Sequence, residues 1–416
     1  MEILNQNTKY VNGPINVVRM QGKVNDIDKV IYLFMDFHSG IQIQTECDNI
    51  YSRDVQLYLA ENFADLTDSG KMYDFFLETH PSWIADAKSE KNHQEFPNYK
   101  DIYIGEVVKL FNKIFNYDPD KNLVRVSDYL KNIRLHYMDV RDYFHLTSEY
   151  EMDYANNLIQ QLWRNTFINK FQVSEILKII TNLNNYLNLL TDILITSKTS
   201  NNSKKIIKQI NVFNPENDEI IKDLVYLIDK IFNKYNNDNV KKIMNKQKNI
   251  IIDYLKELIT LCEQINDNFS KILIEANNET ELTLNKFIGF YYYGLPTEKT
   301  RIFLTEMSNS LSILNIKFIY FFTRFMDLFF LRRFLDKDYI TNAITYTGIY
   351  HSMVYIEILN RDFGFEITHA SQPKDVNIEQ LNEEIKGKNS VELSSILYPK
   401  TLLQCSDMTH FPSKFL

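Results

Sequence analysis

The sequence alternates between two kinds of pattern, and their order along the chain limits the folds it can adopt. Residues 1–149 and 342–370 consist of short apolar runs separated by amphipathic segments, which is typical of strands alternating with helices. Residues 150–341 instead contain long stretches with helical spacing of apolar residues. This order predicts an α/β fold in which helices flank a mostly parallel sheet, with a large all-helical insertion between the N- and C-terminal parts of the sheet.

The individual strands and helices follow from residue type and period. The expected strands are Ile15–Met20, Lys29–Met35, Met72–Leu77, Ile133–Met138, Ala343–Tyr346 and Gly364–Thr368. The expected helices of the α/β part are Asp54–Phe63, Ile102–Asn116 and Tyr350–Asn360. We therefore expect four segments: the first part of the α/β domain (1–149), the helical insertion (150–341), the second part (342–370) and a polar C-terminal tail (371–416).

Charge and hydropathy exclude two classes of partner. The 46 Lys and Arg against 54 Asp and Glu give a net charge of -8, whereas nucleic-acid binding needs clustered positive charge. The most apolar run, Phe318–Leu331, is too short for a stable membrane span and contains Arg324 and Asp327. These two residues share one helical stripe with Lys317 and Tyr320, which indicates a buried helix whose polar stripe faces water or a site.

The cysteines and the N-terminus predict an intracellular protein. Cys47, Cys262 and Cys405 are far apart and odd in number, so the sequence shows no CxxC pair and no disulfide framework. This pattern fits a reducing compartment. The N-terminus lacks the basic and then apolar segments of a secretory signal, so secretion is not expected.

Charged side chains come directly after three of the expected strands, and His351 lies in the first turn beyond the fourth, Ala343–Tyr346. In open α/β sheets, ligands bind beyond the carboxyl ends of the strands, so these residues are the candidate site. Each of them alone has an ordinary structural interpretation: a histidine bonded to a loop, a solvated carboxylate or a structural ion pair. Their arrival at one edge of the sheet favours a shared site. The candidates are Asp36, His38, Glu78, Asp139, Arg141 and His351.

Two histidines near carboxylates suit two kinds of chemistry. His38, Glu78 and His351 would hold a divalent ion such as Zn, Mn or Co, which requires the three side chains to lie within about 5 Å of one another. Without a metal, Glu78 or His38 would act as the general base, and Arg141 would stabilise a developing oxyanion.

Three segments, IYLFMDFHS, YDFFLETHPS and ITYTGIYHS, resemble the pattern of the erythromycin esterase/ChaN/TraB–Tiki superfamily. That pattern is a strand ending in G-E-x-H, a later strand ending in Glu and a late strand ending in G-x-x-H. The matching residues here are Asp36, His38, Glu78, Gly348 and His351. In the first motif, Met35 replaces the glycine and Asp36 the glutamate.

A further segment, RLHYMDVRDYF, resembles an acidic/Arg strand end of the broader group through Asp139 and Arg141. These resemblances cover short segments between about residues 15 and 370. The whole chain also resembles uncharacterised proteins of giant, mimivirus-like DNA viruses, which share its bias towards Asn, Ile, Lys and Tyr.

The resemblance implies a viral hydrolase of esterase or metallopeptidase type that acts on a small molecule or a peptide. The alternative is a catalytically degenerate virion component or host-interaction protein that keeps the fold. Met35, Asp36 and the helical segment motivate this second interpretation, in which the partner would be a virion or host protein. Either role places the protein in the host cytoplasm or the virion.

Overall fold

The computed structural model is a mixed α/β structure, as the sequence predicts at the level of fold class. It describes residues 9–41, 47–67, 69–79, 102–115, 124–144, 148–165, 167–196, 217–278, 282–284, 291–293, 295, 297–373, 377–400, 403–412 and 415. The contacts divide the chain into two compact units. The α/β unit comprises Met1–Val140, Asn236–Val240 and Met326–Leu416, and the helical unit comprises Arg141–Tyr235 and Lys241–Phe325.

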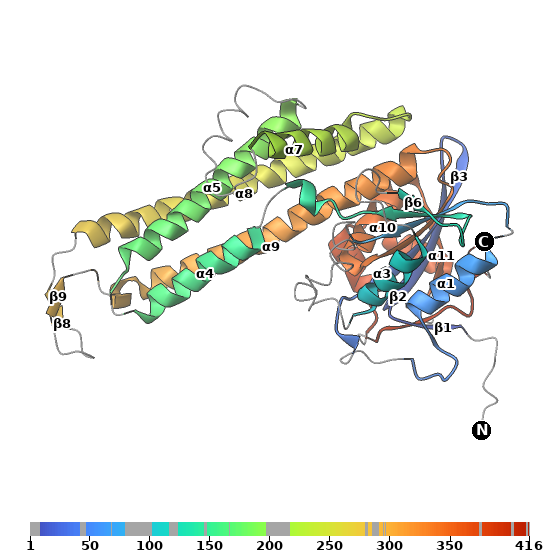
Figure 1. Ribbon diagram of the computed structural model, residues 1–416, viewed down its shortest axis with the longest axis horizontal. Helices are drawn as coiled ribbons and strands as arrows, with labels where there is room; N and C mark the ends of the chain where they lie inside the picture. Colours follow the sequence, from blue (N-terminus) through green and yellow to red (C-terminus); the bar gives the residue numbers. More distant parts are fainter. Residues whose placement is uncertain are drawn as a thin grey trace. The chain divides into compact units, whose positions relative to one another are not determined.

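The α/β unit is built on a seven-stranded sheet in the order β11-β2-β3-β10-β5-β7-β6 (Figure 1). The strands β3, β10, β5 and β7 run parallel to one another, and the remaining three pairings are antiparallel. The strands span Asn16–Val24 (β2), Ile27–Asp36 (β3), Tyr73–Leu77 (β5), Val124–Val126 (β6), Ile133–Tyr137 (β7), Asn342–Gly348 (β10) and Glu366–Ala370 (β11).

The sheet is therefore mixed, and the prediction of a mostly parallel sheet needs correction. β2 and β3 are joined by Asn25 and Asp26, both with positive φ (49° and 62°). A two-residue turn of this kind matches the twist of a hairpin and forces its strands to be antiparallel. The parallel strands nevertheless form the centre of the sheet, and their carboxyl ends meet at one edge.

Both faces of the sheet are covered, which explains the nearly continuous apolar sequence of its central strands. Successive residues of a strand point to opposite faces. Phe75 accordingly contacts Phe63 of α1 (Val55–Asp65) and Phe111 of α3 (Tyr103–Ile114), with ring centroids 5.3 and 5.0 Å away. Phe76 packs on Phe330 near the end of α9 (Thr297–Asp336), at 4.8 Å. The same second face carries α10 (Ile349–Phe363) (Figure 1).

A buried lysine fixes the end of α9 against the sheet. Lys29 of β3 is 1% exposed, and its Nζ donates hydrogen bonds to the carbonyl oxygens of Phe334, Lys337 and Ile340. The last carbonyls of a helix have no partner within the helix, and a cation there also complements the helix dipole. This contact therefore both terminates α9 and sets its position in the α/β unit.

The C-terminal segment, expected as a polar tail, packs into the α/β unit. It contains α11 (Ile378–Ile385), α12 (Ser390–Leu397) and β12 (Cys405–Asp407). β12 pairs with β1 (Tyr10–Asn12), which also pairs with β4 (Arg53–Asp54). The ring of Phe415 lies 5.0 and 6.0 Å from those of Tyr32 and Phe34. Aromatic residues near the end of the chain thus complete the core under α1.

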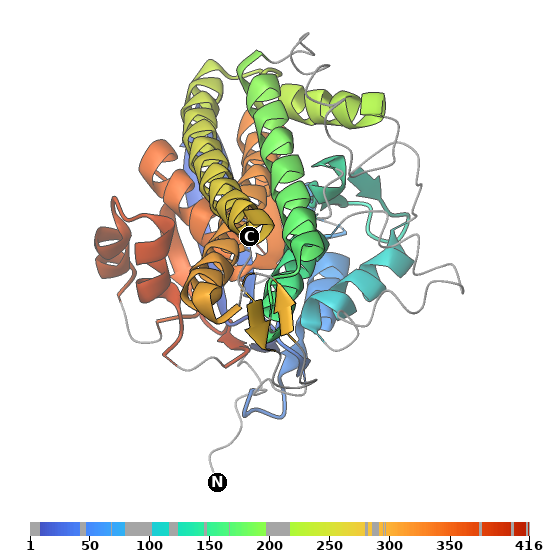
Figure 2. The ribbon, with the colours of Figure 1, turned by 90° about the vertical axis from the view of Figure 1, so that its left-hand side faces the viewer.

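The helical unit consists mainly of long helices. Its helices are α4 (Ser148–Arg164), α5 (Lys170–Thr196), α7 (Asn217–Phe232), α8 (Asp238–Asn278) and the part of α9 up to Phe325, together with the 3-10 helix η2 (Arg141–Phe144). A short hairpin of β8 (Leu282–Leu284) and β9 (Tyr291–Tyr293) also belongs to it. The helices α5 and α8 run side by side, and the Thr181 hydroxyl bonds Asn266 between them (Figure 2).

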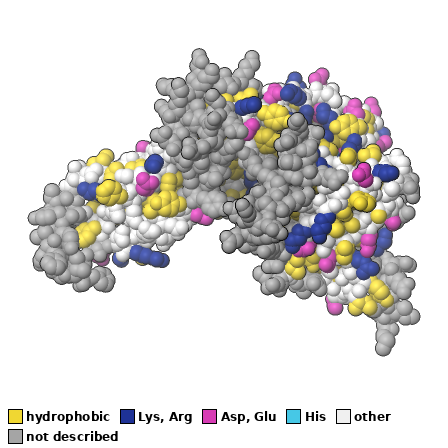
Figure 3. Space-filling view, in the orientation of Figure 1, with side chains coloured by type: hydrophobic (Ala, Val, Ile, Leu, Met, Phe, Trp, Pro, Cys, Tyr) yellow, Lys and Arg dark blue, Asp and Glu magenta, His cyan; other side chains and the backbone are white. Residues whose placement is uncertain are grey.

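None of the helices in the described part of the chain is long and apolar enough to cross a bilayer. On the described part of the surface shown in Figure 3, Lys and Arg side chains are interspersed with Asp and Glu side chains.

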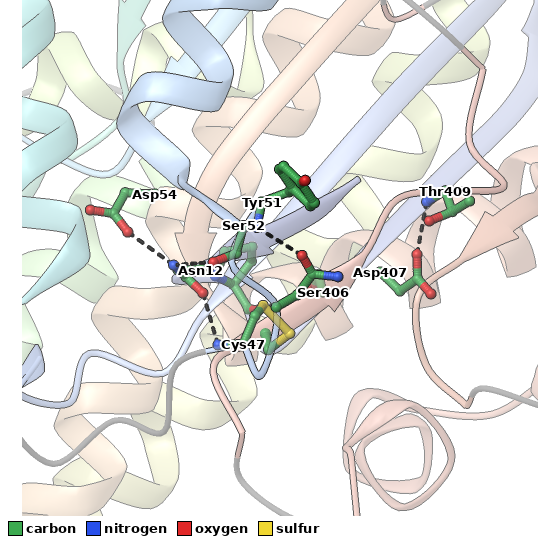
Figure 4. The surroundings of a disulfide bond; sticks show 11 residues. Asn12, Cys47, Tyr51, Ser52, Asp54, Ser406, Asp407 and Thr409 are labelled. Carbon is green, nitrogen blue, oxygen red and sulfur yellow. Dashed lines mark hydrogen bonds between the residues drawn. A yellow bond between two sulfur atoms is a disulfide. The ribbon is translucent and has the colours of Figure 1, made fainter. Parts of the chain in front are cut away.

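Cys47 and Cys405 form a disulfide, with their Cα atoms 5.0 Å apart (Figure 4). The expectation that no disulfide exists is therefore wrong. The two residues are 358 positions apart, so only the folded topology brings them together. Asn12 mediates this approach: it pairs with Cys405 in the β1–β12 ladder, and its Oδ1 accepts the N–H of Cys47 (Figure 4). Cys262 is a buried free thiol.

We expect Cys405→Ser to lower the free energy of unfolding by about 2–4 kcal/mol, because a cross-link that closes a long loop restricts the unfolded chain. Chemical denaturation followed by circular dichroism measures this change. Cys262→Ser, which leaves the disulfide intact, is the control. Thiol titration of the denatured wild type without reductant should find one thiol, that of Cys262. Three reactive thiols and an unchanged stability of Cys405→Ser would contradict the cross-link.

Candidate active site

The side chain of Glu78 lies at the edge where the parallel strands end, between two histidines. Glu78 follows β5 directly, and its backbone N–H donates to the carbonyl oxygen of Tyr346 in β10. Its Oε2 accepts the backbone N–H of Gly348 at 2.6 Å and lies 3.5 Å from Nε2 of His38. Its Oε1 lies 3.3 Å from Nε2 of His351. One carboxylate thus receives a different imidazole on each oxygen.

His38 is held by the aspartate two residues before it. Asp36 Oδ2 accepts both the backbone N–H of His38, at 3.1 Å, and its ring Nδ1, at 2.5 Å. His38 has φ of 55°, in the left-handed region that costs a residue with a side chain about 1–3 kcal/mol unless its surroundings compensate. The Asp36 side chain supplies this compensation in the manner of an Asx turn. Tyr346 in turn donates its hydroxyl to Asp36 Oδ1 at 3.0 Å.

His351 has a matching partner from a distant part of the chain. It lies in the first turn of α10, and its Nδ1 is 2.6 Å from Oδ1 of Asp327 in α9. Asp327 is fully buried, and Tyr355 is also buried, with its ring centroid 6.4 Å from that of His351. The site therefore has two arms, Asp36–His38 and Asp327–His351, which meet at Glu78.

Gly348 makes room for this arrangement. A Cβ added at Gly348 would lie 3.0 Å from Nε2 of His38 and 3.4 Å from Oε2 of Glu78. A side chain at this position would therefore push against both groups. Gly348 is also the residue that precedes α10, so the Glu78 carboxylate sits at the positive end of that helix.

The charges in the site stabilise one another. Burial alone would raise the pKa of Glu78, but the imidazoles of His351 and His38 hold that pKa well below its usual range. Burial alone would lower the pKa of each histidine. Glu78 and Asp327 instead raise the pKa of His351 to about 10, and Glu78 and Asp36 raise that of His38 to about 10. The resting state at neutral pH is thus an ionised Glu78 between two imidazolium rings.

The two arms differ in their access to solvent. The side chain of His38 is 38% exposed, whereas those of His351 and Glu78 are 9% and 11% exposed. The carboxylates of Asp36 and Asp327 are fully buried. A molecule that approaches from solvent therefore meets His38 first.

The donors at this site do not converge as a shared metal ion requires. Each imidazole faces a different oxygen of Glu78, and each Nδ1 is bonded to an aspartate. Within the described ranges, no group of three or more His, Cys, Asp or Glu side chains is arranged to hold a metal ion. His38, Glu78 and His351 are close together, as the sequence predicts, but this geometry fits direct proton transfer better than metal ligation.

The two remaining candidates are Asp139 and Arg141. Asp139 follows β7 and is fully buried, and its backbone N–H donates to the carbonyl oxygen of Thr79 at 3.3 Å. This backbone hydrogen bond connects the segment after β7 to the segment after Glu78. Arg141 begins η2 and belongs to the helical unit, so its suggested role at an oxyanion stays a prediction.

Sequence reasoning did not assign Asp327 or Tyr346 to the site. The signal for Asp327 was its charge within the apolar run Phe318–Leu331, on a stripe expected to face water or a site. Tyr346 gave no such signal, because tyrosine is common in strands and its presence there does not indicate a functional role.

We expect the histidines to make the stability of the α/β unit depend on pH above neutrality. A pKa raised from 6.5 to about 10 gives His351 a stabilising contribution that is complete below about pH 6.5 and is lost as pH rises through 10. Glu78→Gln removes the main charge that raises this pKa. The free energy of unfolding should therefore fall more steeply between about pH 6.5 and 10 in the wild type than in this variant.

Urea denaturation across this pH range tests the difference. The control is Glu383→Gln, which removes a carboxylate that is 78% exposed beside Lys386 and should keep the wild-type slope. Equal slopes for the wild type and Glu78→Gln would show that Glu78 does not hold the two imidazolium rings.

Comparison with known proteins places this chain among viral sequences. Residues 9–416 match the model of a family described as "Family of unknown function (DUF5847)". Uncharacterized protein R706 of Acanthamoeba polyphaga mimivirus is 40% identical over 420 residues, covering 100% of this chain and 99% of its own length. Uncharacterized protein R161 of the same virus is 35% identical over 441 residues, with both chains covered completely. The expected likeness to mimivirus proteins is confirmed. No solved structure matches the chain.

Proposed function

We propose that this chain, which belongs to the DUF5847 family, is a hydrolase that cleaves an ester or amide bond with His38 as its general base. The observation that carries the proposal is the Glu78 carboxylate, which is shared by two imidazoles that are each backed by a buried aspartate. Strongly shifted pKa values that arise from specific charge partners are typical of acid–base sites. The resemblance of the three strand-end segments to the erythromycin esterase/ChaN/TraB–Tiki superfamily supports hydrolysis as the reaction.

In this mechanism the aspartate on Nδ1 prepares His38 to accept a proton at Nε2. Because Asp36 accepts the Nδ1–H, the neutral ring keeps its free electron pair on Nε2, the nitrogen that faces Glu78. Water that donates one hydrogen to Nε2 and the other to Glu78 Oε2 is oriented for attack on a carbonyl carbon. As its oxygen bonds to that carbon, His38 takes the first proton, and it returns the proton to the leaving group when the tetrahedral intermediate collapses.

His351 would remain charged throughout. It is nearly buried between Asp327 and Glu78, so it serves as a fixed positive charge that keeps Glu78 ionised and oriented. Preorganised charge of this kind costs no rearrangement during the reaction. His38 exchanges protons during the reaction, and the positive charge of His351 keeps the neighbouring Glu78 carboxylate ionised while this happens.

We also infer where the protein acts. A disulfide persists outside the reducing cytosol, so the Cys47–Cys405 bond favours the virion over the host cytoplasm. In this proposal the helical unit is an insertion into the α/β fold, since the chain leaves the α/β unit after Val140 and the last part of that unit begins at Met326. Mass spectrometry of purified virions tests the location.

Purified protein should hydrolyse members of a panel of p-nitrophenyl esters and chromogenic peptide amides. His38→Gln should lower kcat by about 10²–10⁴-fold, because it removes the general base. His369→Gln, which changes a half-buried histidine of β11 outside the site, should keep wild-type turnover. Chelators should not change the rate. Absence of turnover across the panel, or turnover that survives in His38→Gln, would contradict the proposed function.

The proposed base also predicts the form of the pH profile. Because Glu78 and Asp36 raise the pKa of His38 to about 10, kcat/KM should increase with pH until it levels off near that value. Asp36→Asn removes one of these charges while keeping an oxygen that accepts the N–H of His38. The increase should therefore shift to lower pH. Asp26→Asn, an exposed aspartate in the β2–β3 turn, is the matched control and should leave the profile in place. A profile that does not move in Asp36→Asn would assign the base to another group.

A further inference from the structure

Asp327 is a carboxylate in surroundings that do not suit a charge. It is 0% exposed, and its neighbours Met326, Leu328 and Phe330 in α9 are buried apolar residues. Burial of a carboxylate without a partner costs several kcal/mol. The charge is balanced by the His351 ring, whose Nδ1 lies 2.6 Å from Asp327 Oδ1. This contact connects two helices, α9 and α10, across 24 positions of sequence.

The position of Asp327 is set by the scaffold. Lys29 of β3 anchors the end of α9 through the carbonyl of Phe334 and the residues that follow the helix through those of Lys337 and Ile340. Phe330, one turn after Asp327, packs on Phe76 of β5 at 4.8 Å and on Tyr355 of α10 at 4.4 Å. The Asp327 carboxylate thus lies on a helix whose position is fixed by the Lys29 hydrogen bonds at its end and by the aromatic contacts of Phe330.

We infer that Asp327 is a positioning residue: it fixes the His351 ring through Nδ1, so that Nε2 faces Glu78 Oε1 and Glu78 keeps its other oxygen for His38. The ring of His351 has two nitrogens, and Asp327 and Glu78 occupy one each. If the ring turned, Glu78 would lose the cation on Oε1 and would no longer be held between the two arms. Asp327 does not contact the reacting atoms, and its effect on the reaction passes through His351 and Glu78.

The groups that face His351 come from three elements. Glu78 approaches from the end of β5, Asp327 from α9 and Tyr355 from within α10. Tyr355 stays neutral because burial and then the charges of Asp327 and Glu78 raise its pKa well above its usual value. The two carboxylates are therefore the charges that determine the state of the His351 ring.

The catalytic consequence of this inference rests on the proposed hydrolase, whereas its structural consequence does not. The experiment therefore compares variants by two readouts. The first is the protonation of the ring nitrogens in protein labelled with 15N-histidine, with the His351 signals assigned by their loss in His351→Gln. The second is the separate effect on kcat and KM for an ester that the wild type hydrolyses.

The variants are Asp327→Asn, Asp327→Glu and, as a matched control, Asp336→Asn. Asp336 is an equally buried carboxylate of α9, whose Oδ1 accepts the backbone N–H groups of Asn236 and Asn237 rather than a histidine. A purely structural effect of losing a buried carboxylate in this helix should appear in both asparagine variants.

We expect His351 to carry protons on both ring nitrogens in the wild type and in Asp336→Asn at about pH 8, and to lose the second proton at a lower pH in Asp327→Asn than in these two proteins. Asp327→Asn should lower kcat by about 10²-fold with KM nearly unchanged, because the loss concerns the arrangement of catalytic groups rather than substrate binding. Asp327→Glu retains the charge and should recover part of the rate and the doubly protonated ring.

The outcomes separate this inference from the proposed function. A wild type without hydrolytic activity, combined with loss of the doubly protonated His351 at a lower pH in Asp327→Asn alone, would reject the hydrolase and retain the positioning of His351. An active wild type whose Asp327→Asn variant keeps the His351 signals and the kcat would reject the positioning role and retain the hydrolase. Equal losses in Asp327→Asn and Asp336→Asn would assign Asp327 a structural role only.

Discussion

The arrangement of the site depends on the sharing of one carboxylate by two imidazoles. Glu78 Oε1 and Oε2 lie 3.3 and 3.5 Å from the Nε2 atoms of His351 and His38, and Oε2 also accepts the N–H of Gly348. Without a negative charge between them, two imidazolium rings would repel each other and one would lose its proton. The two buried aspartates then supply each ring with a second partner, so that every charge in the cluster has an opposite charge beside it.

The sheet order explains how these groups meet. β10 lies between β3 and β5, so that Gly348 pairs with Asp36 and Tyr346 with Leu77, the residue before Glu78. The presence of an aspartate at position 36 also has a local explanation. Asp36 reaches both the N–H and the ring of the residue two positions later, and a glutamate, which is one methylene longer, would not close the same turn. The aspartate is thus suited to holding His38 in its left-handed conformation.

Sequence reasoning located the central residues of the site because strand ends are local features. His38, Glu78 and His351 each follow an apolar strand, and parallel strands bring their carboxyl ends to one edge. The partner of His351 could not be found in this way, since Asp327 arrives on a helix whose place is set by Lys29 and by aromatic packing. The Cys47–Cys405 bond was missed for the same reason: its two residues meet only through strand pairing between the two ends of the chain. The antiparallel pairing of β2 with β3, in contrast, could have been predicted from the sequence, because only a short turn separates the two strands.

In the proposed mechanism, the unequal exposure of the two arms gives the two aspartate–histidine pairs different roles. A histidine that exchanges protons with a substrate must be reachable, and His38 is 38% exposed, whereas His351 is 9% exposed. A charge that must remain constant during a reaction is better kept away from water, where the lower dielectric strengthens its interactions. The buried arm can therefore keep Glu78 ionised while the exposed arm gains and loses a proton. In the proposed mechanism, one aspartate–histidine pair thus serves as a proton carrier and the other as a fixed charge, and the difference in burial assigns these roles.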